Sequence, residues 1–419
     1  MASTHLLDGQ EIDISTFKDL EIRDLLTFED VTPLKDKSRV RLNFVGFSIN
    51  QNDEAVAVFP KHFEFDNTSV LDSFAPVFRA IQRANSDAVT SSWGKDPSST
   101  DPAITDCNFP FRAFYQIYAY YQQYGLHLDE VRVDSSAKGK IYWKKTLSQA
   151  TFYPIKKAIV PFPLRRESSV RISHLITDAM VYAINHTINL FGPLINLAPI
   201  PYQTSIQQGA QNYGLVSRGL RQLRAQTFND RVVELIDSLI DYFNQANPGS
   251  GYYFKIRNFA FVWQSAVSSF LKKEFVALDA SNVPVLSEVS ADDDRFSNLI
   301  IRNVNEIRPE QYVDIDHFWL DQSRNIQYVF DAKYYNNVSD LNYKQIFYTL
   351  ICGLDLATQG VSTVSALILP SRGFRSKTHF SLSERFARQL KIQNSTLDIQ
   401  EIYLDCRTVI RHFECSDAR

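Results

Sequence analysis

Two aspartates and an acid–lysine pair lie close together in the segment VDIDHFWLDQSRNIQYVFDAKYYN, residues 313–336. The alternation of its apolar residues is typical of two strands separated by a polar turn. Strand side chains alternate between the two faces of a sheet, so Asp314 and Asp316 are predicted to share one face. Asp331 and Lys333 are predicted to share a face of the returning strand. The segment therefore concentrates acids and one lysine on a strand pair.

The position of the turn decides which acids meet. A hairpin that turns near residues 322–325 brings Asp316 opposite Asp331 with arms of equal length, whereas Asp314 would leave one arm longer. We therefore favour Asp316, with Asp314 as the alternative or as a neighbouring acid. Two facing carboxylates repel each other unless a cation lies between them. Mg²⁺ prefers such oxygen ligands and retains waters or substrate phosphate as its other ligands, so we expect a magnesium site.

The lysine would supply the second half of this chemistry. Lys333 could stabilise the charge that develops on an attacked phosphate, or orient the attacking water. Acids, lysine and a divalent cation on one sheet face are the parts needed for metal-assisted hydrolysis of a phosphodiester. An Asp-x-Lys tripeptide is common, and the alternative is a hairpin with charged margins. The apolar strand before Asp331 and the later pair Lys344–Gln345 favour the catalytic interpretation.

The elements around this hairpin predict an α/β domain. A helix is expected before it, and a helix, a buried strand and a strand–helix pair are expected after it. Such an order fits a mixed central sheet with helices on its faces. The segments are IRNFAFVWQSAVSSFLKKEF (256–275), DLNYKQIFYTLICGL (340–354), STVSALILP (362–370) and QEIYLDCRTVIRHF (400–413).

The chain of 419 residues is long enough for two or three domains. Residues 1–100 are predicted to be β-rich, because residues 39–60 alternate like two strands joined by a turn at 50–54. This region is the candidate for docking a partner or recognising DNA. Residues 101–248 are predicted to be an α+β, partly basic region, bounded by stretches rich in Ser, Pro and Gly. Residues 249–419 would then form the domain that carries the hairpin.

The net charge of −3 excludes a global positive field as the route to nucleic acid. DNA contact would require a local patch or a partner. Residues 138–171 contain nine Lys or Arg and one acid, and could bind phosphates, form a solvated face or bind a partner. The candidates for DNA contact are Lys144 and Lys145 and the helical row Arg218, Arg221 and Arg224, which shows no compensating acid on its own face.

The sequence also predicts the cellular compartment. The four cysteines show no CxxC pairing, and the first residues lack the basic and apolar regions of a signal peptide. No apolar run reaches the length of a membrane-spanning helix. A cytoplasmic protein with reduced thiols and no membrane association is expected.

The motif DAKYY followed by a helix with KQIFY resembles the nuclease core of the PD-(D/E)XK superfamily. The form of this motif looks most like that of LlaJI-type restriction endonucleases and McrC nuclease subunits. Two upstream segments, residues 43–63 and 124–147, also resemble sequence blocks of the LlaJI family. The resemblance implies a C-terminal PD-(D/E)XK core and a Mg²⁺-dependent DNA endonuclease of a bacterial restriction system that defends against phage. It also suggests that Gln345 approaches the metal site or the scissile phosphate.

The resemblance also implies a partner. Nucleases of this kind are commonly paired with a separately encoded McrB-like AAA+ GTPase, and this chain has no GxxxxGK[ST] motif of its own. A homo-oligomer is compatible with these expectations. The alternatives are a degenerate nuclease-fold protein that stimulates a partner GTPase, and a restriction enzyme that works alone.

Two positions depart from the family pattern. A proline is expected before the first acid, but Val313 precedes Asp314 and Ile315 precedes Asp316. A glutamate is often found on the first core helix, where this chain has Gln264. Glutamine has a carbonyl oxygen but no negative charge, so Gln264 is the weaker candidate for a place near the metal.

Overall fold

The structure is a computed structural model, and its chain divides into two compact units. Unit 1 comprises Met1–Cys107, Pro193–Ile195 and Gly251–Arg419, and unit 2 comprises Asn108–Gly192 and Asn196–Ser250. The regions predicted as separate N-terminal and C-terminal domains thus belong to one unit. The structure describes residues 3–66, 69–91, 105–135, 140–155, 158–172, 175–246, 251–287, 295–356, 360–383, 385 and 397–415.

A five-stranded sheet forms the first part of unit 1, in the order β1-β6-β5-β13-β7. The hairpin predicted around residues 50–54 is β5–β6, and the side-chain oxygen of Asn50 accepts hydrogen bonds from the backbone N–H groups of Asn52 and Glu54. β13 follows unit 2 in the chain and pairs with β5, so this sheet depends on a long-range contact. The strands are β1 (Ser3–Leu7), β5 (Val45–Ile49), β6 (Ala55–Phe59), β7 (Thr105–Cys107) and β13 (Tyr252–Ile256).

A second, three-stranded sheet in the order β2-β4-β3 packs beside the first. Phe17 and Leu20 of α1 are buried in one apolar cluster with Val40 of β4 and with Val56 and Val58 of β6. The elements are β2 (Glu11–Asp13), α1 (Ile14–Ile22), the short 3₁₀ helix η1 (Phe28–Asp30), β3 (Val31–Pro33), β4 (Arg39–Leu42) and α2 (Val70–Ser91).

The rest of unit 1 is built on a six-stranded mixed sheet in the order β16-β17-β18-β19-β21-β20. β16, β17 and β18 are antiparallel, β18, β19 and β21 are parallel, and β20 is antiparallel to β21. The predicted α/β class is therefore correct. The strands are β16 (Ser297–Ile301), β17 (Val313–Asp321), β18 (Ile326–Ala332), β19 (Ser362–Ser371), β20 (Arg375–Ser381) and β21 (Asp398–Asp405), and a separate hairpin pairs β14 (Phe275–Leu278) with β15 (Pro284–Leu286).

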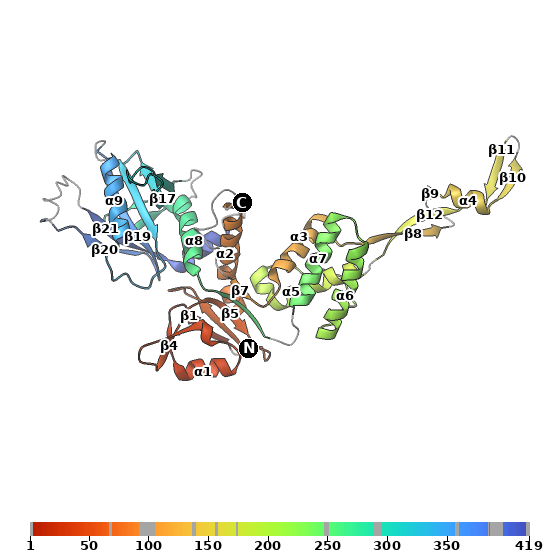
Figure 1. Cartoon of the computed structure of the whole chain (residues 1–419), viewed down its shortest axis with the longest axis horizontal. Helices are drawn as coiled ribbons and strands as arrows, with labels where there is room; N and C mark the ends of the chain where they lie inside the picture. The colour runs from red at the N-terminus through yellow and green to blue at the C-terminus, as the bar shows by residue number, and fades with distance from the viewer. Residues whose placement is uncertain are drawn as a thin grey trace. The chain divides into compact units, whose positions relative to one another are not determined.

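Helices cover both faces of this sheet. α9 (Tyr343–Leu356) and α8 (Phe259–Glu274) lie on opposite sides of β17–β19 in Figure 1. Tyr348 of α9 packs on Ile315 and Val329, whereas Phe275, directly after α8, packs on Tyr328 and Phe330. Alternate residues of β18 are therefore buried on opposite faces of the sheet, one covered by α9 and the other by the segment at the end of α8. The last helix is α11 (Cys406–Cys415), which contacts α2 and α8.

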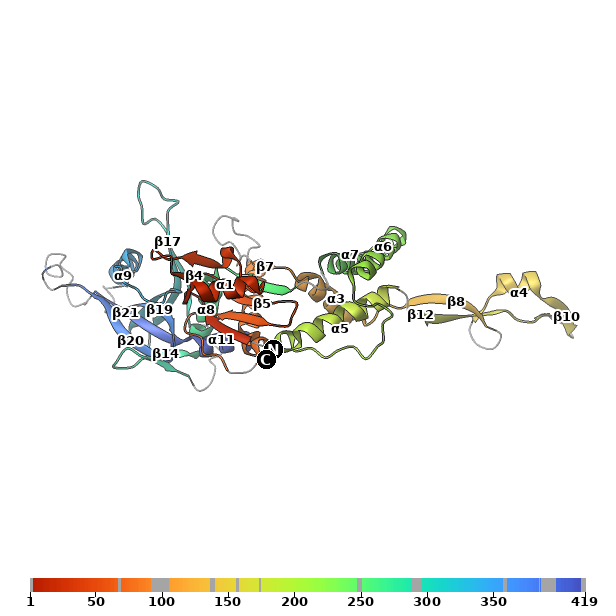
Figure 2. The same ribbon diagram turned by 90° about the horizontal axis from the view of Figure 1, so that it is seen from below.

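Unit 2 combines a helical part with a strand-rich extension. In Figure 2, β8 and β12 run side by side from the helices toward α4 and the β10–β11 hairpin. No described helix is both long and apolar enough to cross a membrane. The elements are α3 (Phe111–Tyr124), β8 (Asp129–Ser135), β9 (Lys140–Ile141), α4 (Trp143–Gln149), β10 (Thr151–Ile155), β11 (Ala158–Phe162), β12 (Arg166–Ile172), α5 (Leu175–Ile195), α6 (Ala210–Gln226) and α7 (Asp230–Gln245).

Candidate functional site

The β17–β18 hairpin forms as the sequence predicts. Its pairing runs from Asp321 opposite Ile326 to His317 opposite Phe330, and residues 322–325 form the turn. Continuing this register by one residue sets Asp316 opposite Asp331, at the end of the paired region. β18 ends at Ala332, and the next backbone N–H, that of Lys333, donates to the carbonyl oxygen of Ile368 on β19 at 2.8 Å. The two acids and the lysine thus lie at the same end of the sheet.

Asp331 is a buried carboxylate with little compensation. The residue is 2% exposed. The Lys333 ammonium nitrogen lies 2.8 Å from Asp331 Oδ2, close enough for an ion pair. The Lys333 ion pair therefore partners Oδ2, and no hydrogen bond within the described part of the chain reaches that oxygen. A carboxylate oxygen has about two lone-pair sites, so the ion pair leaves Oδ2 room for a further ligand.

Asp316 is half-buried and electrostatically coupled to Asp331. Burial raises the pKa of Asp316, and the negative charge of Asp331 raises it further. Lys344 and Lys333 oppose this increase in pKa without cancelling it. The Asp316 and Asp331 carboxylates therefore repel each other when both are ionised, and a divalent cation between them would offset this repulsion.

Lys344 is a second cation at the site that the sequence analysis did not assign a role. It lies in the first turn of α9, and its ammonium group is 5.1 Å from the centre of the Tyr348 ring. Partial burial lowers the pKa of Lys344, but hydrogen bonding to Tyr348 and the nearby Asp331 and Asp316 carboxylates outweigh that effect and raise it. Its place directly before Gln345 in KQIFY was the available signal.

Asp314 is engaged differently from Asp316. Its carboxylate oxygen Oδ1 accepts a hydrogen bond from Asn298 Nδ2, and its backbone oxygen accepts one from the Tyr348 hydroxyl at 2.7 Å. Asp331 affects the pKa of Asp316 more strongly than Asp314 does. These contacts favour Asp316 over Asp314 as the partner of Asp331.

Gln345 is fully buried and fixes α9 to the sheet. Its amide nitrogen donates to the backbone oxygen of Val329 and to the Ser365 hydroxyl, both at 2.8 Å. Gln345 is therefore not a solvent-facing residue of this helix. Both donors are used inside the fold, and no described hydrogen bond joins Gln345 to Asp331 or Lys333. Its contacts support a positioning role for the strand that carries Asp331.

Gln264 is not brought to this site by any described hydrogen bond or ion pair. It is half-buried on α8. Phe275, the residue directly after this helix, packs on the sheet face of Tyr328 and Phe330, whereas Val329 and Asp331 alternate onto the face of α9. The sequence similarity alone had suggested a place near the metal for Gln264.

The arginine row on α6 has partners that its own sequence does not show. Arg224 Nε lies 3.0 Å from Asp237 Oδ1 of α7, and Arg221 Nη2 donates to Asn244 Oδ1 at 3.3 Å. The acid near Arg224 thus comes from another helix, because α7 packs along α6. Arg218 is exposed.

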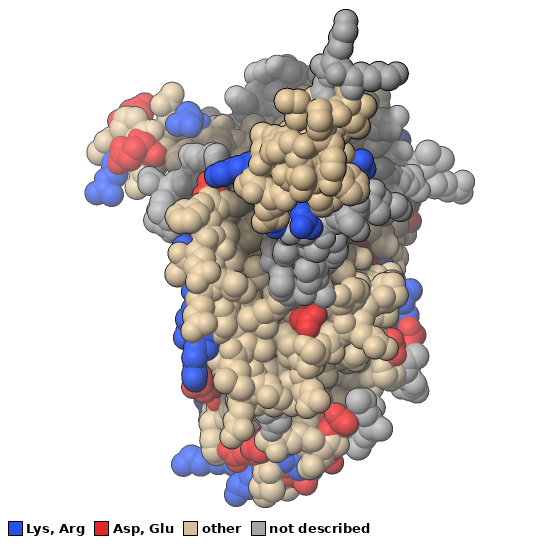
Figure 3. Space-filling model, turned by 90° about the vertical axis from the view of Figure 1, so that its right-hand side faces the viewer, with Lys and Arg blue, Asp and Glu red and all other residues tan. Residues whose placement is uncertain are grey.

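The basic run at 138–171 lies only partly within the described residues, since Lys138, Lys156 and Lys157 lie outside them. Lys144 is exposed on α4 and Lys145 is half-buried. The more pronounced feature here is apolar: Ile159 is 71% exposed and Phe162 is 63% exposed. Figure 3 shows this end of unit 2 as a largely uncharged surface with a few Lys and Arg at its margin. We call it the apolar tip; its exposed side chains include Trp143, Leu147, Phe152, Tyr153, Ile155, Ile159 and Phe162.

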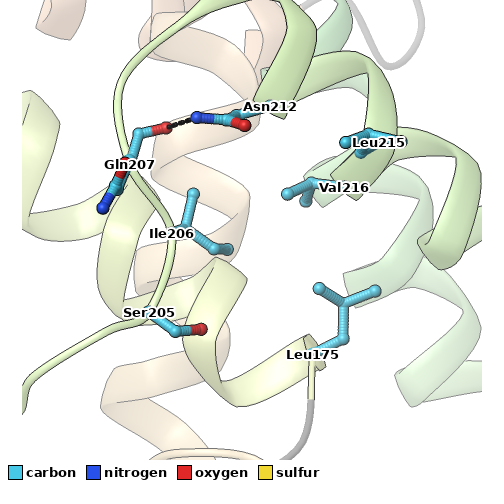
Figure 4. A pocket seen from close by; sticks show the side chains of 7 residues that line it. All are labelled: Leu175, Ser205, Ile206, Gln207, Asn212, Leu215 and Val216. Carbon is cyan, nitrogen blue, oxygen red and sulfur yellow. Dashed lines mark hydrogen bonds between the residues drawn. The ribbon is translucent and has the colours of Figure 1, made fainter.

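A pocket of about 430 Å³ lies in unit 2, between the start of α5, residues 205–207 and α6. Figure 4 shows its lining, in which Asn212 Nδ2 donates to the backbone oxygen of Gln207 at 3.4 Å. The other lining side chains are Leu, Ile, Val and Ser, and none of the seven titrates near neutral pH. This pocket offers neither an acid, a base nor a metal ligand set, so the catalytic candidates remain at the β17–β18 hairpin.

The donor set at the hairpin fits a magnesium ion in a limited way. Among the described residues, no group of three or more His, Cys, Asp or Glu side chains could hold a metal ion. Two carboxylates nevertheless suffice for Mg²⁺, which commonly binds through one or two carboxylates together with waters and substrate phosphates. The buried Asp331 Oδ2, which has the Lys333 ion pair but no described hydrogen bond, is the observation that fits such an ion.

Neither a protein-family model nor a curated protein matches this chain. The similarity to LlaJI-type and McrC nucleases therefore stays a prediction from the motifs. The chemistry of the site rests on four side chains and the sheet that holds them: Asp316, Asp331, Lys333 and Lys344.

Proposed function

We propose that this chain is a Mg²⁺-dependent DNA endonuclease subunit of a bacterial restriction system. The observation that carries the proposal is a buried Asp331 that is ion-paired with Lys333, accepts no described hydrogen bond on Oδ2 and is set opposite Asp316. The element order also supports a PD-(D/E)XK core. α8 is followed by the antiparallel β16, β17 and β18, and then by α9 and the parallel strand β19.

Asp331 and Asp316 would hold the metal. Bound Mg²⁺ would supply positive charge that polarises the phosphate and favours attack by water. The protein itself holds both carboxylates at the end of a sheet, where the Asp331 side chain is buried from solvent. Lys333, 22% exposed, can reach a phosphate oxygen while it stays close to Asp331. Lys344 adds a second positive charge from the start of α9.

A partner is supported by the apolar tip. Monomeric proteins rarely expose contiguous large apolar side chains without an interaction that covers them. We therefore assign partner docking to unit 2 rather than to residues 1–100, and a McrB-like AAA+ GTPase is the partner that the motif resemblance implies. Cytoplasmic localisation belongs to the same proposal.

The second candidate is a non-catalytic assembly protein that stimulates a GTPase. The limited donor set and Gln264 in place of glutamate favour this reading over a restriction enzyme that works alone. The two candidates differ in one property: an assembly protein has no need to bind a divalent cation at Asp331.

The proposal is tested by cleavage of plasmid DNA with Mg²⁺, with and without GTP and the partner GTPase. Lys333→Ala should abolish cleavage and leave the circular dichroism spectrum and partner binding unchanged. Lys18→Ala, which removes an exposed lysine of α1, is the matched control and should cleave like the natural chain. Cleavage retained in Lys333→Ala would remove the catalytic assignment.

A further inference from the structure

A second charged cluster lies on the same sheet face as Asp331. The strand register aligns Asp331 with Leu367 of β19, Leu367 with Glu401 of β21, and Glu401 with Lys377 of β20. Aligned residues of neighbouring strands project from the same face of a sheet. The edge strand β20 therefore presents its cations on the face that carries the candidate catalytic groups.

Lys377 is held in place but remains accessible. Its ammonium nitrogen lies 3.0 Å from Glu401 Oε2, and its side chain is 55% exposed. Glu401 is 2% exposed and is also bound by the Tyr403 hydroxyl and by His379, whose Nδ1 lies 2.9 Å from Oε1. The buried carboxylate thus anchors an ammonium group that still faces solvent.

Arg375 and Arg372 add positive charge that lacks acidic partners in the described part of the chain. The Arg375 guanidinium lies 4.3 Å from the centre of the Tyr403 ring, one row along the face from Lys377. Arg372 is exposed in the turn before β20. The nearby Asp405 carboxylate accepts hydrogen bonds from the backbone N–H groups of Gly373 and Thr408.

His62 lies close enough to these cations for their charge to act on it. Burial lowers the pKa of His62, and the positive charges of Arg372 and Arg375 lower it further. His62 belongs to the loop after β6, in the same unit, so two segments distant in sequence meet at these cations. A concentration of like charges of this kind is typical of an anion-binding surface.

The spacing suits a nucleic-acid duplex. β20 is three strands from β18, and neighbouring strands lie about 4.8 Å apart, so the two clusters are separated by roughly 14 Å. The major groove of B-DNA is about 12 Å wide. One duplex could therefore set one phosphate at Lys333 and another at β20.

We propose that Arg372, Arg375 and Lys377, the β20 cation site, bind backbone phosphates of DNA whose scissile phosphate lies at Asp331 and Lys333. The proposal rests on the nuclease function above and adds the surface that holds the substrate. Phosphate contacts of this kind position the duplex and carry no sequence information.

The test is binding of a fluorescent DNA duplex to the full chain, measured by anisotropy from low to moderate salt with Ca²⁺ in place of Mg²⁺ to prevent cleavage. Arg372→Ala/Arg375→Ala should weaken binding about tenfold or more at low salt. It should also reduce the slope of log K against log [salt] by about two, because each phosphate contact contributes about 0.9. This variant leaves the Glu401 cluster intact, which protects the fold. Arg375→Ala/Lys377→Ala should give the same loss.

The matched control is Arg39→Ala/Arg41→Ala, which removes two exposed arginines of β4 that pair with Glu11. It should change neither the affinity nor the slope. Equal binding by Arg372→Ala/Arg375→Ala and the natural chain, or no DNA binding by the natural chain, would overturn the β20 cation site. Failure of the nuclease function is distinguishable, because DNA binding would keep its dependence on Arg372 and Arg375 while Mg²⁺ produced no cleavage.

Discussion

Asp331 and Glu401 lie on one face of one sheet, and each is 2% exposed with a lysine within 3.0 Å, yet their surroundings differ. The Glu401 carboxylate forms an ion pair with Lys377 and hydrogen bonds with His379 and the Tyr403 hydroxyl. Asp331 has an ion pair with Lys333 but no hydrogen-bond donor on Oδ2 among the described residues, and it faces a second acid, Asp316.

The difference separates a structural carboxylate from one left open for a ligand. A buried charge that is fully paired and hydrogen-bonded can be explained by the fold alone. A buried charge that is underbonded and repelled by a neighbour needs another explanation, and such groups are concentrated at functional sites. The two carboxylates can therefore serve as matched positions in mutagenesis.

The largest difference is expected in DNA cleavage. Asp331→Asn removes the negative charge that would hold the metal and should reduce the rate by about 10²–10³-fold or more, the range seen when one electrostatic group is removed from a catalytic site. Glu401→Gln should change the rate of a saturated enzyme by less than about threefold, because it does not touch the reacting groups. Single-turnover cleavage with Mg²⁺ measures both, and similar losses would erase the distinction.

The order of effects should reverse for stability. Glu401→Gln weakens hydrogen bonds to a buried charged group and should lower the free energy of unfolding by about 1.5–3 kcal/mol. Asp331→Asn relieves the repulsion with Asp316 and should cost less than Glu401→Gln. Urea unfolding without divalent ions gives both values, and a larger loss for Asp331→Asn would mean that Asp331 is the structural carboxylate.

A smaller difference is expected in the pH dependence of unfolding. Burial alone would raise the pKa of Glu401, but hydrogen bonds from Tyr403, Lys377 and His379 outweigh it and hold the pKa below its ordinary value of 4.5. Stability from Glu401 is therefore present above pH 4.5 and is lost as the pH falls through the lower pKa of the folded state.

The pKa of Asp316 is shifted in the opposite direction, above 3.8, because of burial and the charge of Asp331. The folded chain then holds the proton more tightly than the unfolded chain, so stability falls as the pH rises from 3.8 through the raised pKa. Asp316→Asn should remove this decrease, and Glu401→Gln should remove the loss at low pH. Unfolding curves from pH 3 to 7 would contradict the comparison if either variant kept the natural profile.

Local patterns predicted the elements that carry Asp316 and Asp331. Alternation and the polar turn predicted the hairpin at 313–332, and helical spacing predicted α9, because both depend on residues close in sequence. The pairing of Asp316 with Asp331 followed from the turn position alone. These features needed no knowledge of the rest of the chain.

Other features depend on pairings between distant segments, which local patterns do not encode. β13 completes the N-terminal sheet, although its residues were assigned to the C-terminal domain. The Glu401 cluster requires β20 beside β21, and Asp237 reaches Arg224 from another helix. Local patterns therefore could not predict that the β20 cations share a sheet face with Asp331.

Asp331 is proposed to hold a divalent cation, and calorimetric titration of the full chain with Mg²⁺ or Mn²⁺ tests this role without a partner or DNA. The natural chain and Glu401→Gln should each bind the cation with similar affinity, whereas Asp331→Asn should show no binding in the same concentration range. Equal binding by Asp331→Asn and the natural chain, or no binding by the natural chain, would contradict the claim.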